Sequence, residues 1–318
     1  MIVDSNTFDH CLPEVVAAVQ PLEQAEFVEV PVGEDCKSVE IASQVWQAMI
    51  ESGADRNSVV VAVGGGAVCD LAGFVAAGYE RGVRLVNIPT SLIAMADAAI
   101  GGKTAVNLGG VKNPVGFFKM ADIVCVEPSL LASLPKAELK SGAFEVVKTA
   151  AVADPELFSE LIGGALEPFS AQAITCVAEI KQAIVKADPK DHDIRHILNF
   201  GHTFGHAIEA YSVHGGMRMS HGVAVGIGMA MAMRLSVLKL GLAREVYDSY
   251  CQYLTQRIEF PQYTLRDAEQ MLPLIHHDKK CAGGQVLAVL LRKPGEAVID
   301  VALSDNELLD TLLSGMAL

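Results

Sequence analysis

The apolar positions in the first part of the chain alternate between short β-rich runs and helical stretches. Residues 59–63 form a continuous run of valine and alanine, which is typical of a strand buried on both faces. Three glycines at 64–66 then precede an apolar segment at 67–77, which we expect to be a helix. Further β-like runs follow at 85–88 and 123–126. Strands that alternate with helices predict a parallel sheet that binds its ligands at the carboxyl ends of the strands.

From about residue 135 the pattern changes to long segments with helical periodicity, at 137–152, 170–187, 197–212, 221–240 and 242–256. Near the C-terminus, two β-like runs at 286–291 and 297–301 are joined by the turn sequence Lys293-Pro294-Gly295-Glu296, and a short helix is expected from Asp305. The pattern therefore predicts an α/β fold in two domains. We expect residues 1–136 to form a Rossmann-like parallel-sheet domain and residues 137–318 to form a mainly α-helical domain.

Composition and charge narrow the class of protein. With 318 residues, of which 51% are hydrophobic and 19% charged, the chain can bury a large core. The net charge of −14 argues against nucleic acid or an anionic membrane as a partner. The longest apolar run, 222–233, is too short to span a bilayer and is followed by Arg234, so we expect a buried helix. The N-terminal residues resemble a strand running into a turn and show no signal peptide.

The cysteines indicate a reducing compartment. There are seven, an odd number, and none stands in a Cys-x-x-Cys pair. We therefore expect a cytoplasmic protein without disulfides and without a cysteine-bound zinc.

The strongest chemical signal is the segment Asn199-Phe200-Gly201-His202-Thr203-Phe204-Gly205-His206, followed by Ser220-His221-Gly222. Histidines four residues apart lie on one face of a helix and commonly present imidazoles to a divalent metal. Upstream, Glu145 and Lys148 also have helical spacing. A carboxylate with two imidazoles makes a three-ligand site with open positions, which is the catalytic pattern. For the histidine pair alone, a polar helix face is the simpler alternative.

Two glycine-rich segments are candidate anion sites. The segment Gly64 to Asp70 lies between a strand and a helix, where backbone N–H groups can cradle a pyrophosphate, although a tight turn explains it nearly as well. The segment Gly101-Gly102-Lys103-Thr104 lacks the earlier glycine of a phosphate loop, which excludes an NTPase. We expect Lys103 and Lys112-Asn113 to lie in loops that offer charge to an anionic ligand, the alternative being solvated loop lysines.

In order and spacing, these motifs resemble those of the 3-dehydroquinate synthases, within the sugar-phosphate cyclase superfamily. The resemblance covers nearly the whole chain. It rests on Gly-Gly-Gly-x-x-x-Asp-Leu-Ala-Gly, Arg81-Gly82-Val83, Pro-Thr-Ser-Leu, Asp97 with Gly-Gly-Lys-Thr, Lys112-Asn113, Glu145-x-x-Lys148 and Asn-x-Gly-His-x-x-Gly-His.

The resemblance implies three groups of site residues. Those implied for NAD are Asp4, Glu34, Lys37, Gly65, Gly66, Asp70, Thr90, Ser91, Asp97 and Lys112. Those implied as metal ligands are Glu145, His202 and His221. Those implied as catalytic are Lys103, Lys148, Lys181, Arg195, Asn199 and His206, with Arg81, Asn113 and Lys279 as further substrate contacts.

The function implied is that of a phosphate-eliminating carbon–oxygen lyase of the shikimate pathway, a homodimer that uses NAD and Zn²⁺ or Co²⁺. It converts 3-deoxy-D-arabino-heptulosonate 7-phosphate to 3-dehydroquinate and phosphate through transient oxidation, elimination, re-reduction, ring opening and aldol closure. Independently of the resemblance, six lysines and arginines among the catalytic and substrate residues suit a doubly anionic ligand in an acidic protein. His206 is a natural proton carrier.

The chain departs from the family pattern at a few positions. Cys69 stands for a usual glycine, Ala98 and Ala99 for two serines, and Val223 for a glutamate. Two alternative functions therefore stay open: another sugar-phosphate cyclase acting on a sedoheptulose phosphate, or an NAD- and metal-dependent polyol-phosphate dehydrogenase. A binding paralogue without activity would be expected to lack some of the ligand residues.

Overall fold

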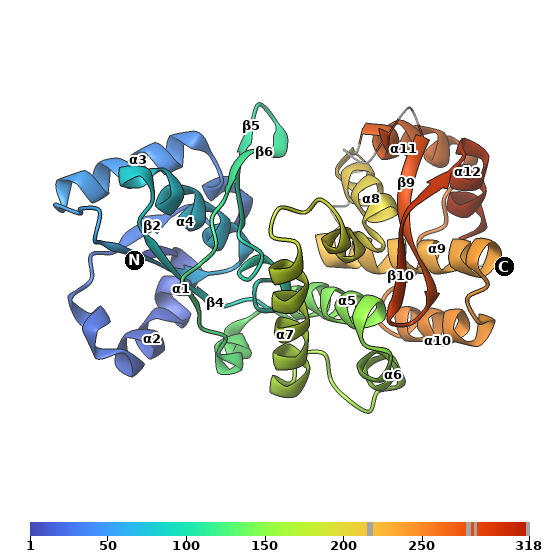
Figure 1. The fold of residues 1–318 in the computed structure, drawn as a ribbon, viewed down its shortest axis with the longest axis horizontal. Helices are drawn as coiled ribbons and strands as arrows, with labels where there is room; N and C mark the ends of the chain where they lie inside the picture. The colour runs from blue at the N-terminus through green and yellow to red at the C-terminus, as the bar shows by residue number, and fades with distance from the viewer. Residues whose placement is uncertain (215–218, 278–280, 283–284, 316–318) are drawn as a thin grey trace. The chain divides into compact units, whose positions relative to one another are not determined.

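The structure is a computed structural model that describes residues 1–214, 219–277, 281–282 and 285–315. Contacts divide the chain into two compact units (Figure 1). Unit 1 comprises residues 1–139 and 174–182, and unit 2 comprises residues 140–173 and 183–318. The helix α7 (Ala171–Ala187) therefore contributes its middle to unit 1 and its ends to unit 2, which no single boundary in the sequence describes.

Unit 1 is built on a five-stranded parallel sheet in the order β2-β1-β3-β4-β7. The Rossmann-like parallel sheet predicted from the sequence is confirmed. The strands are β1 (Ile2–Asp4), β2 (Val28–Val30), β3 (Val59–Gly64), β4 (Arg84–Pro89) and β7 (Ile123–Val124). The central strand β3 is buried from its second residue onward, as expected for an apolar strand covered on both faces.

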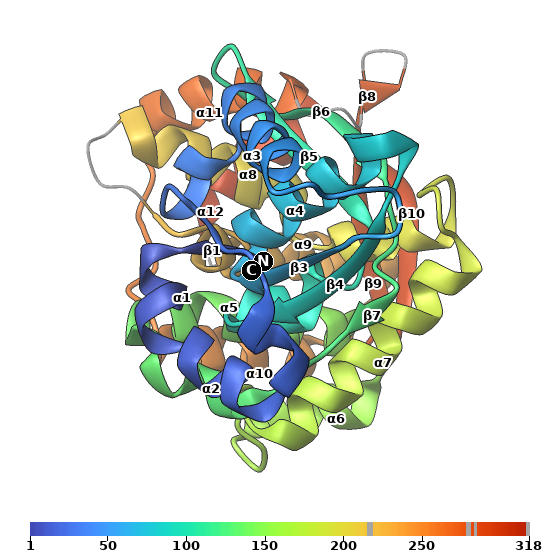
Figure 2. The ribbon, with the colours of Figure 1, turned by 90° about the vertical axis from the view of Figure 1, so that its left-hand side faces the viewer.

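Helices cover both faces of this sheet. α3 (Val39–Glu51) and α4 (Gly66–Gly78) lie on one side, and α1 (Ser5–His10) and α2 (Leu12–Ala18) lie on the other (Figure 2). The expected turn after the first strand is wrong, because a helix begins there at once. Asp4 caps α1 by accepting a hydrogen bond from the Thr7 N–H at 2.9 Å, and Thr7 bonds back to the cap backbone.

The predicted loops around Lys103 and Lys112 are also wrong. These residues lie in an antiparallel hairpin of β5 (Lys103–Leu108) and β6 (Val111–Phe118), which turns at two glycines with positive φ. β5 packs on α4, and Gly116 allows close strand pairing, since a Cβ there would lie 2.0 Å from the Thr104 carbonyl oxygen. The other short helices of unit 1 are η1 (Gln20–Gln24), η2 (Gly33–Cys36), η3 (Tyr79–Arg81), η4 (Ala94–Ala98) and η5 (Pro128–Ser133).

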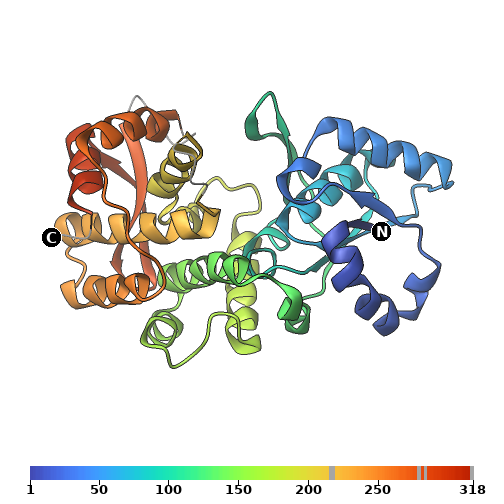
Figure 3. The same ribbon diagram turned by 180° about the vertical axis from the view of Figure 1, so that it is seen from behind.

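Unit 2 is mainly helical, as predicted. Its helices are α5 (Lys136–Ala153, of which the first residues belong to unit 1), α6 (Pro155–Gly163), η6 (Ile194–Asn199), α8 (His202–His214), α9 (His221–Leu240), α10 (Arg244–Thr255), α11 (Leu265–His277) and α12 (Asp305–Ser314). A three-stranded antiparallel sheet in the order β10 (Glu296–Leu303), β9 (Gln285–Lys293) and β8 (Cys281–Ala282) packs on α9. Figure 3 shows α9 and α10 side by side.

The helix expected over 197–212 is interrupted. η6 ends at Asn199, and α8 begins only at His202. The break centres on Gly201, whose φ of 79° lies in the left-handed region that favours glycine. A Cβ at Gly201 would also lie 2.9 Å from the Val225 carbonyl oxygen of α9, so the glycine serves close packing as well as the turn.

α9 is the central helix of unit 2. By length and composition alone it could cross a membrane, but 72% of its apolar window is buried within the structure, as in the core helix of a soluble protein. Its glycines let neighbouring backbone approach. A Cβ at Gly222 would lie 1.9 Å from the Ser141 carbonyl oxygen of α5, and one at Gly228 would lie 2.1 Å from the Gly201 carbonyl oxygen. This packing brings the start of α9 to α5 and α8.

Candidate active site

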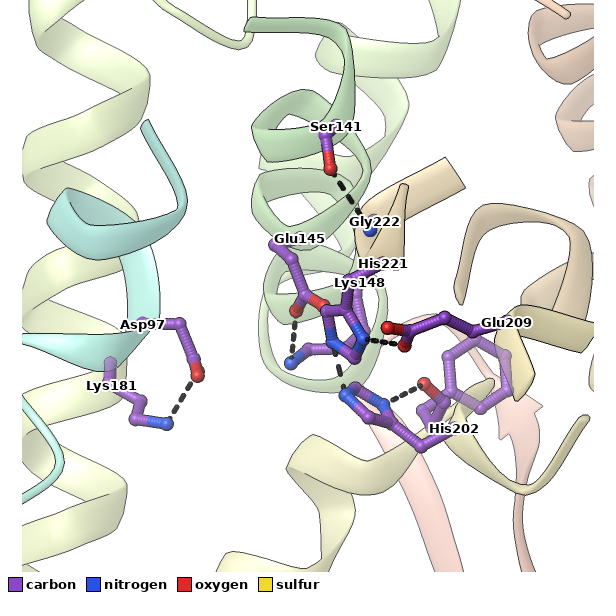
Figure 4. A network of polar contacts seen from close by, with 10 residues as sticks. Asp97, Ser141, Glu145, Lys148, Lys181, His202, Glu209, His221 and Gly222 are labelled. Carbon is purple, nitrogen blue, oxygen red and sulfur yellow. Dashed lines mark hydrogen bonds and ion pairs between the residues drawn. The ribbon is translucent and has the colours of Figure 1, made fainter. Parts of the chain in front are cut away.

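Three side chains from three helices converge in unit 2 (Figure 4). Glu145 lies within α5, His202 is the first residue of α8, and His221 is the first residue of α9. The Gly222 N–H donates a hydrogen bond to Ser141 Oγ at 3.0 Å, and Ser141 precedes Glu145 by one helical turn. This bond ties the start of α9 to α5 and places His221 beside the carboxylate.

The distances between these groups suit a tetrahedral metal ion. Glu145 Oε1 lies 3.3 Å from His221 Nε2 and 3.7 Å from His202 Nε2. Two ligands held about 2.0–2.1 Å from a tetrahedral Zn²⁺ are about 3.3 Å apart, so a small movement would enclose an ion. Both oxygens of Glu145 are buried. Oε2 is paired with the Lys148 ammonium at 2.6 Å, whereas Oε1 faces the two imidazoles, so a bound cation would take its place at Oε1.

The hydrogen bonds of the two imidazoles orient Nε2 toward the carboxylate. His202 Nδ1 lies 3.2 Å from the Phe200 carbonyl oxygen, which can only accept. His221 Nδ1 lies 2.8 Å from Glu209 Oε2. Each Nδ1 therefore carries a proton, and in the neutral form of each ring Nε2 would present a lone pair. Such outer partners are typical of metal-binding histidines.

Burial and charge set the protonation of the group. Burial lowers the pKa of His202 well below its ordinary value, and the charge of Lys148 adds to this effect. Burial alone would raise the pKa of Glu145, but Lys148, His221 and His202 outweigh it and hold that pKa well below the ordinary value. Burial also disfavours the charged form of His221, yet its bonds to Glu145 and Glu209 raise its pKa to about 10. A metal at His221 Nε2 would therefore displace a proton.

His206 offers a second set of three ligands. It lies one turn after His202 on α8, and donor atoms of His202, His206 and His221 all lie within 4.8 Å of one another. The two sets share two histidines. We favour the set with Glu145, because an ionised carboxylate offsets part of the charge of a divalent cation and this one is buried next to both histidines.

Lys148 is buried, not solvated. Its side chain is 1% exposed, and Nζ lies 2.6 Å from Glu145 Oε2. The two residues are one turn apart on α5, so the predicted helical pairing places a cation next to the candidate metal ligands.

Arg195 and Asn199 lie on η6, just before α8. Arg195 is buried, and its Nη1 donates to the Pro189 carbonyl oxygen at 3.3 Å. The loop that carries it is organised by Asp188, whose carboxylate accepts backbone N–H bonds from His192 at 3.0 Å, Asp193 at 2.7 Å and Arg195 at 3.2 Å. These bonds lower the pKa of Asp188 to about 2.

In unit 1 the ends of β3 and β4 bring together four predicted nucleotide residues. The Thr90 N–H donates to the Gly64 carbonyl oxygen at 3.0 Å, and a Cβ at Gly65 would lie 3.4 Å from Ser91 Oγ. α4 begins at Gly66, and no side chain caps its first turn. The N–H groups of such a turn suit a pyrophosphate.

A buried lysine links the turn to the hairpin. Lys37 Nζ donates to Asp70 Oδ2 and to Asn113 Oδ1, each at 2.7 Å, and lies 4.0 Å from Glu34 Oε1. Asn113, predicted as a substrate contact, is thus placed among the predicted nucleotide residues. Burial raises the pKa of Asp70 to about 6 although Lys37 opposes this shift. Asp4, at the end of β1, is occupied in capping α1.

The remaining predicted residues are more scattered. Within unit 1, Lys181 Nζ forms an ion pair with Asp97 Oδ1 at 2.5 Å (Figure 4). Lys103 and Lys112 are exposed on the hairpin. Arg81 follows the carboxyl end of α4, whose thirteen residues place it about 20 Å from the glycine turn. Lys279 lies outside the described residues.

Sequence reasoning missed the supporting residues Ser141, Asp188, Asn107 and Glu209. Asn107 Oδ1 accepts the Asn113 N–H at 3.0 Å, while its Nδ2 donates to Glu34 Oε2 at 2.9 Å. Only Glu209 had a usable signal, since it stands seven residues after His202 and so falls on the same face of α8.

Comparison with known proteins identifies both halves of the chain. The family model for the 3-dehydroquinate synthase N-terminal region matches residues 27–141, and that for the C-terminal region matches residues 142–281. A 3-dehydroquinate synthase from Dehalococcoides mccartyi is 43% identical over 280 residues, which cover 86% of this chain and 77% of that protein. The resemblance drawn from the motifs is confirmed.

Solved structures agree with the fold. The 2-epi-5-epi-valiolone synthase from Streptomyces hygroscopicus subsp. jinggangensis, with NAD⁺ and Zn²⁺ bound, has a TM-score of 0.83 at 28% identity and covers 98% of this chain and 89% of its own. A 2-deoxy-scyllo-inosose synthase complexed with carbaglucose-6-phosphate, NAD⁺ and Co²⁺ has a TM-score of 0.85 at 24% identity, covering 99% and 89%, and supports the fold alone. On the family matches and the sequence identity, the chain belongs to the 3-dehydroquinate synthase family.

Proposed function

We propose that this protein is a 3-dehydroquinate synthase, which converts 3-deoxy-D-arabino-heptulosonate 7-phosphate to 3-dehydroquinate and phosphate with bound NAD and a divalent metal. The observation that carries the proposal is the convergence of Glu145, His202 and His221 in a member of this family. The reaction class is phosphate elimination by a carbon–oxygen lyase, and NAD is regenerated in each turnover.

Glu145, His202 and His221 hold the metal, Zn²⁺ or Co²⁺. When bound, the metal supplies a Lewis acid that polarises a substrate hydroxyl, and NAD supplies the temporary oxidant. The chain contributes one ionised carboxylate and two imidazoles whose Nε2 lone pairs face it, so that further coordination positions stay open.

The cations of unit 2 suit the anionic groups of the substrate. Lys148 and Arg195 are both buried, where a charge interacts with an anion more strongly than in water. His206, whose ring centroid lies 5.1 Å from that of His202, is the proposed proton carrier. The side-chain amide of Asn199, on η6 with Arg195, can donate and accept hydrogen bonds and is a further proposed contact. Lys103 and Lys181 of unit 1, with Arg81, Asn113 and Lys279, complete the proposed substrate contacts.

The nucleotide residues lie in unit 1. The turn at Gly65 and Gly66 and the first turn of α4 suit the pyrophosphate. Thr90 and Ser91 follow the neighbouring strand, and the Lys37–Asp70 pair borders the same helix. Asp4, Glu34, Asp97 and Lys112 are the remaining proposed NAD contacts. We propose accordingly that residues 1–136 bind NAD and that residues 137–318 bind metal and substrate, with Arg81, Lys103 and Asn113 as the substrate contacts contributed by the first range.

We also propose that the protein is a cytoplasmic homodimer. The compartment is supported by the cysteines, because Cys11, Cys36, Cys69, Cys125, Cys176 and Cys251 are free thiols. Sedimentation at several concentrations tests the dimer.

The function is tested by incubating the protein with the heptulosonate phosphate, NAD and Co²⁺. The release of phosphate and the mass of the product are then measured. One equivalent of NAD should support many turnovers without a lasting rise in NADH absorbance. Turnover of sedoheptulose 7-phosphate alone would instead identify a sister cyclase. Stoichiometric NADH from a polyol phosphate would identify a dehydrogenase.

A further inference from the structure

Glu209 contacts the candidate metal site through a histidine. Its Oε2 lies 2.8 Å from His221 Nδ1, and Figure 4 shows the His221 ring between the carboxylates of Glu209 and Glu145. The three groups thus form a line from Glu209 through the imidazole to the Oε1 atom of Glu145, 3.3 Å from Nε2.

Glu209 and His202 come from the same helix. They are seven residues apart on α8, which is close to two full turns, so both face the same side. α8 therefore supplies the His202 imidazole directly, and it orients the His221 imidazole of α9 through the Glu209 side chain. A change in the rotation of α8 would move both.

His221 needs this support more than His202 does. The His221 side chain is 36% exposed, whereas that of His202 is 12% exposed. The backbone carbonyl of Phe200 holds the more buried ring, and backbone cannot be lost by substitution. The more exposed ring is oriented by a side chain that is itself 17% exposed and carries a negative charge.

We infer that Glu209 is a positioning residue for the metal site, which holds His221 with Nδ1 protonated and Nε2 facing Glu145 and so raises the affinity for the divalent ion. In this inference Glu209 acts through His221 and is not itself a metal ligand. The inference rests on the proposed metal site. Carboxylates in this position orient an imidazole, make it a better donor and typically change metal affinity by about 10–100-fold.

Two substitutions separate orientation from charge. Glu209→Gln keeps a hydrogen-bond acceptor and removes the charge, whereas Glu209→Ala removes both. Tyr211→Phe is the matched control on the same helix, because it deletes the bond from the Tyr211 hydroxyl to Asp267 Oδ1 at 2.6 Å. Each purified full-length protein is stripped of metal and titrated with Zn²⁺ alone in competition with a chromophoric chelator. The absorption spectrum of bound Co²⁺ reports the ligand geometry.

The expected result is a Zn²⁺ affinity about 10–100-fold weaker for Glu209→Ala, a smaller loss for Glu209→Gln and no change for Tyr211→Phe. The Co²⁺ spectrum should change in Glu209→Ala alone. Unchanged affinity in Glu209→Ala, equal losses in both Glu209 variants, or an equal loss in the control would overturn the positioning role. Failure of the unsubstituted protein to bind Zn²⁺ would overturn the metal site itself and so mark a failure of the proposed function.

Discussion

The carboxylate of Asp188 accepts a hydrogen bond from the backbone N–H of Arg195 at 3.2 Å. Asp188 is the residue that ends α7, and Arg195 is a proposed substrate contact on η6. The same carboxylate accepts hydrogen bonds from two further backbone N–H groups of the intervening loop. The Asp188 side chain therefore fixes the position of the Arg195 backbone. If Arg195 binds the substrate as proposed, that binding would depend on Asp188 through the backbone alone.

Replacing Asp188 by Asn should weaken substrate binding through Arg195. An amide has one acceptor oxygen where the carboxylate uses two, so at least one of the three N–H bonds is lost. We expect KM to rise by several-fold or more, because a misplaced contact weakens binding. Initial rates against the heptulosonate phosphate measure this, with zinc affinity as the control that should not change.

The same substitution should alter the dependence of stability on pH. The folded-state pKa of Asp188 is about 2, below the value of about 3.9 in an unfolded chain. The stabilisation of the folded protein by ionised Asp188 is therefore complete above about pH 4 and is lost as the pH falls toward 2. In urea unfolding between these values, Asp188→Asn should lose less stability per pH unit than the unsubstituted protein. Parallel curves would show that the three backbone bonds do not depend on the charge.

Replacing the metal ligand His202 by Ala should abolish turnover and leave NAD binding intact, since the proposed NAD residues lie in unit 1. Zinc content after dialysis should fall, while the circular dichroism spectrum should keep its helical signal. Full activity in this variant after exhaustive chelation would remove His202 from the metal site.

Replacing Lys148 by Met should lower kcat/KM by roughly 10²-fold or more, by analogy with the loss of one preorganised charge in an active site. The exposed Lys140 on the same helix is the matched control, and Lys140→Met should cost almost nothing. NAD affinity should be nearly constant in both. An unchanged kcat/KM in Lys148→Met would exclude the lysine from the mechanism, and a large loss of NAD binding would contradict the proposed division of the chain.

Replacing Gly228 by Ala should destabilise unit 2 by roughly 1–3 kcal/mol or more, because the new Cβ would lie 2.1 Å from the Gly201 carbonyl oxygen. Gly163→Ala on α6 is the control, since a Cβ there meets nothing within 4 Å and should stabilise by about 0.5–1 kcal/mol. Urea unfolding of both variants measures the difference. Equal stability would mean that α8 and α9 can separate without loss.

Much of the fold followed from local pattern. The buried run at 59–63 predicted β3, and the expected helix over 221–240 has the bounds of α9. These elements are long or uniformly apolar, so periodicity and length alone identify them. The hairpin of β5 and β6 was missed, because its glycines and lysines indicate loops and its strands form only where Thr104 and Gly116 pack together.

The candidate site also has features that the sequence determined and features that only the tertiary structure decided. The sequence alone determined which residue types could bind a metal, because the spacing of His202 and His206 is a property of any helix and the motifs identify the family. The tertiary structure alone decided that His221 meets Glu145, that Lys148 is buried, and that Glu209 and Asp188 hold neighbouring groups in place. The physical reason is the range of the contacts. Residues within one helix share a face through the backbone geometry, whereas residues from α5, α8 and α9 meet only after glycines let those helices approach.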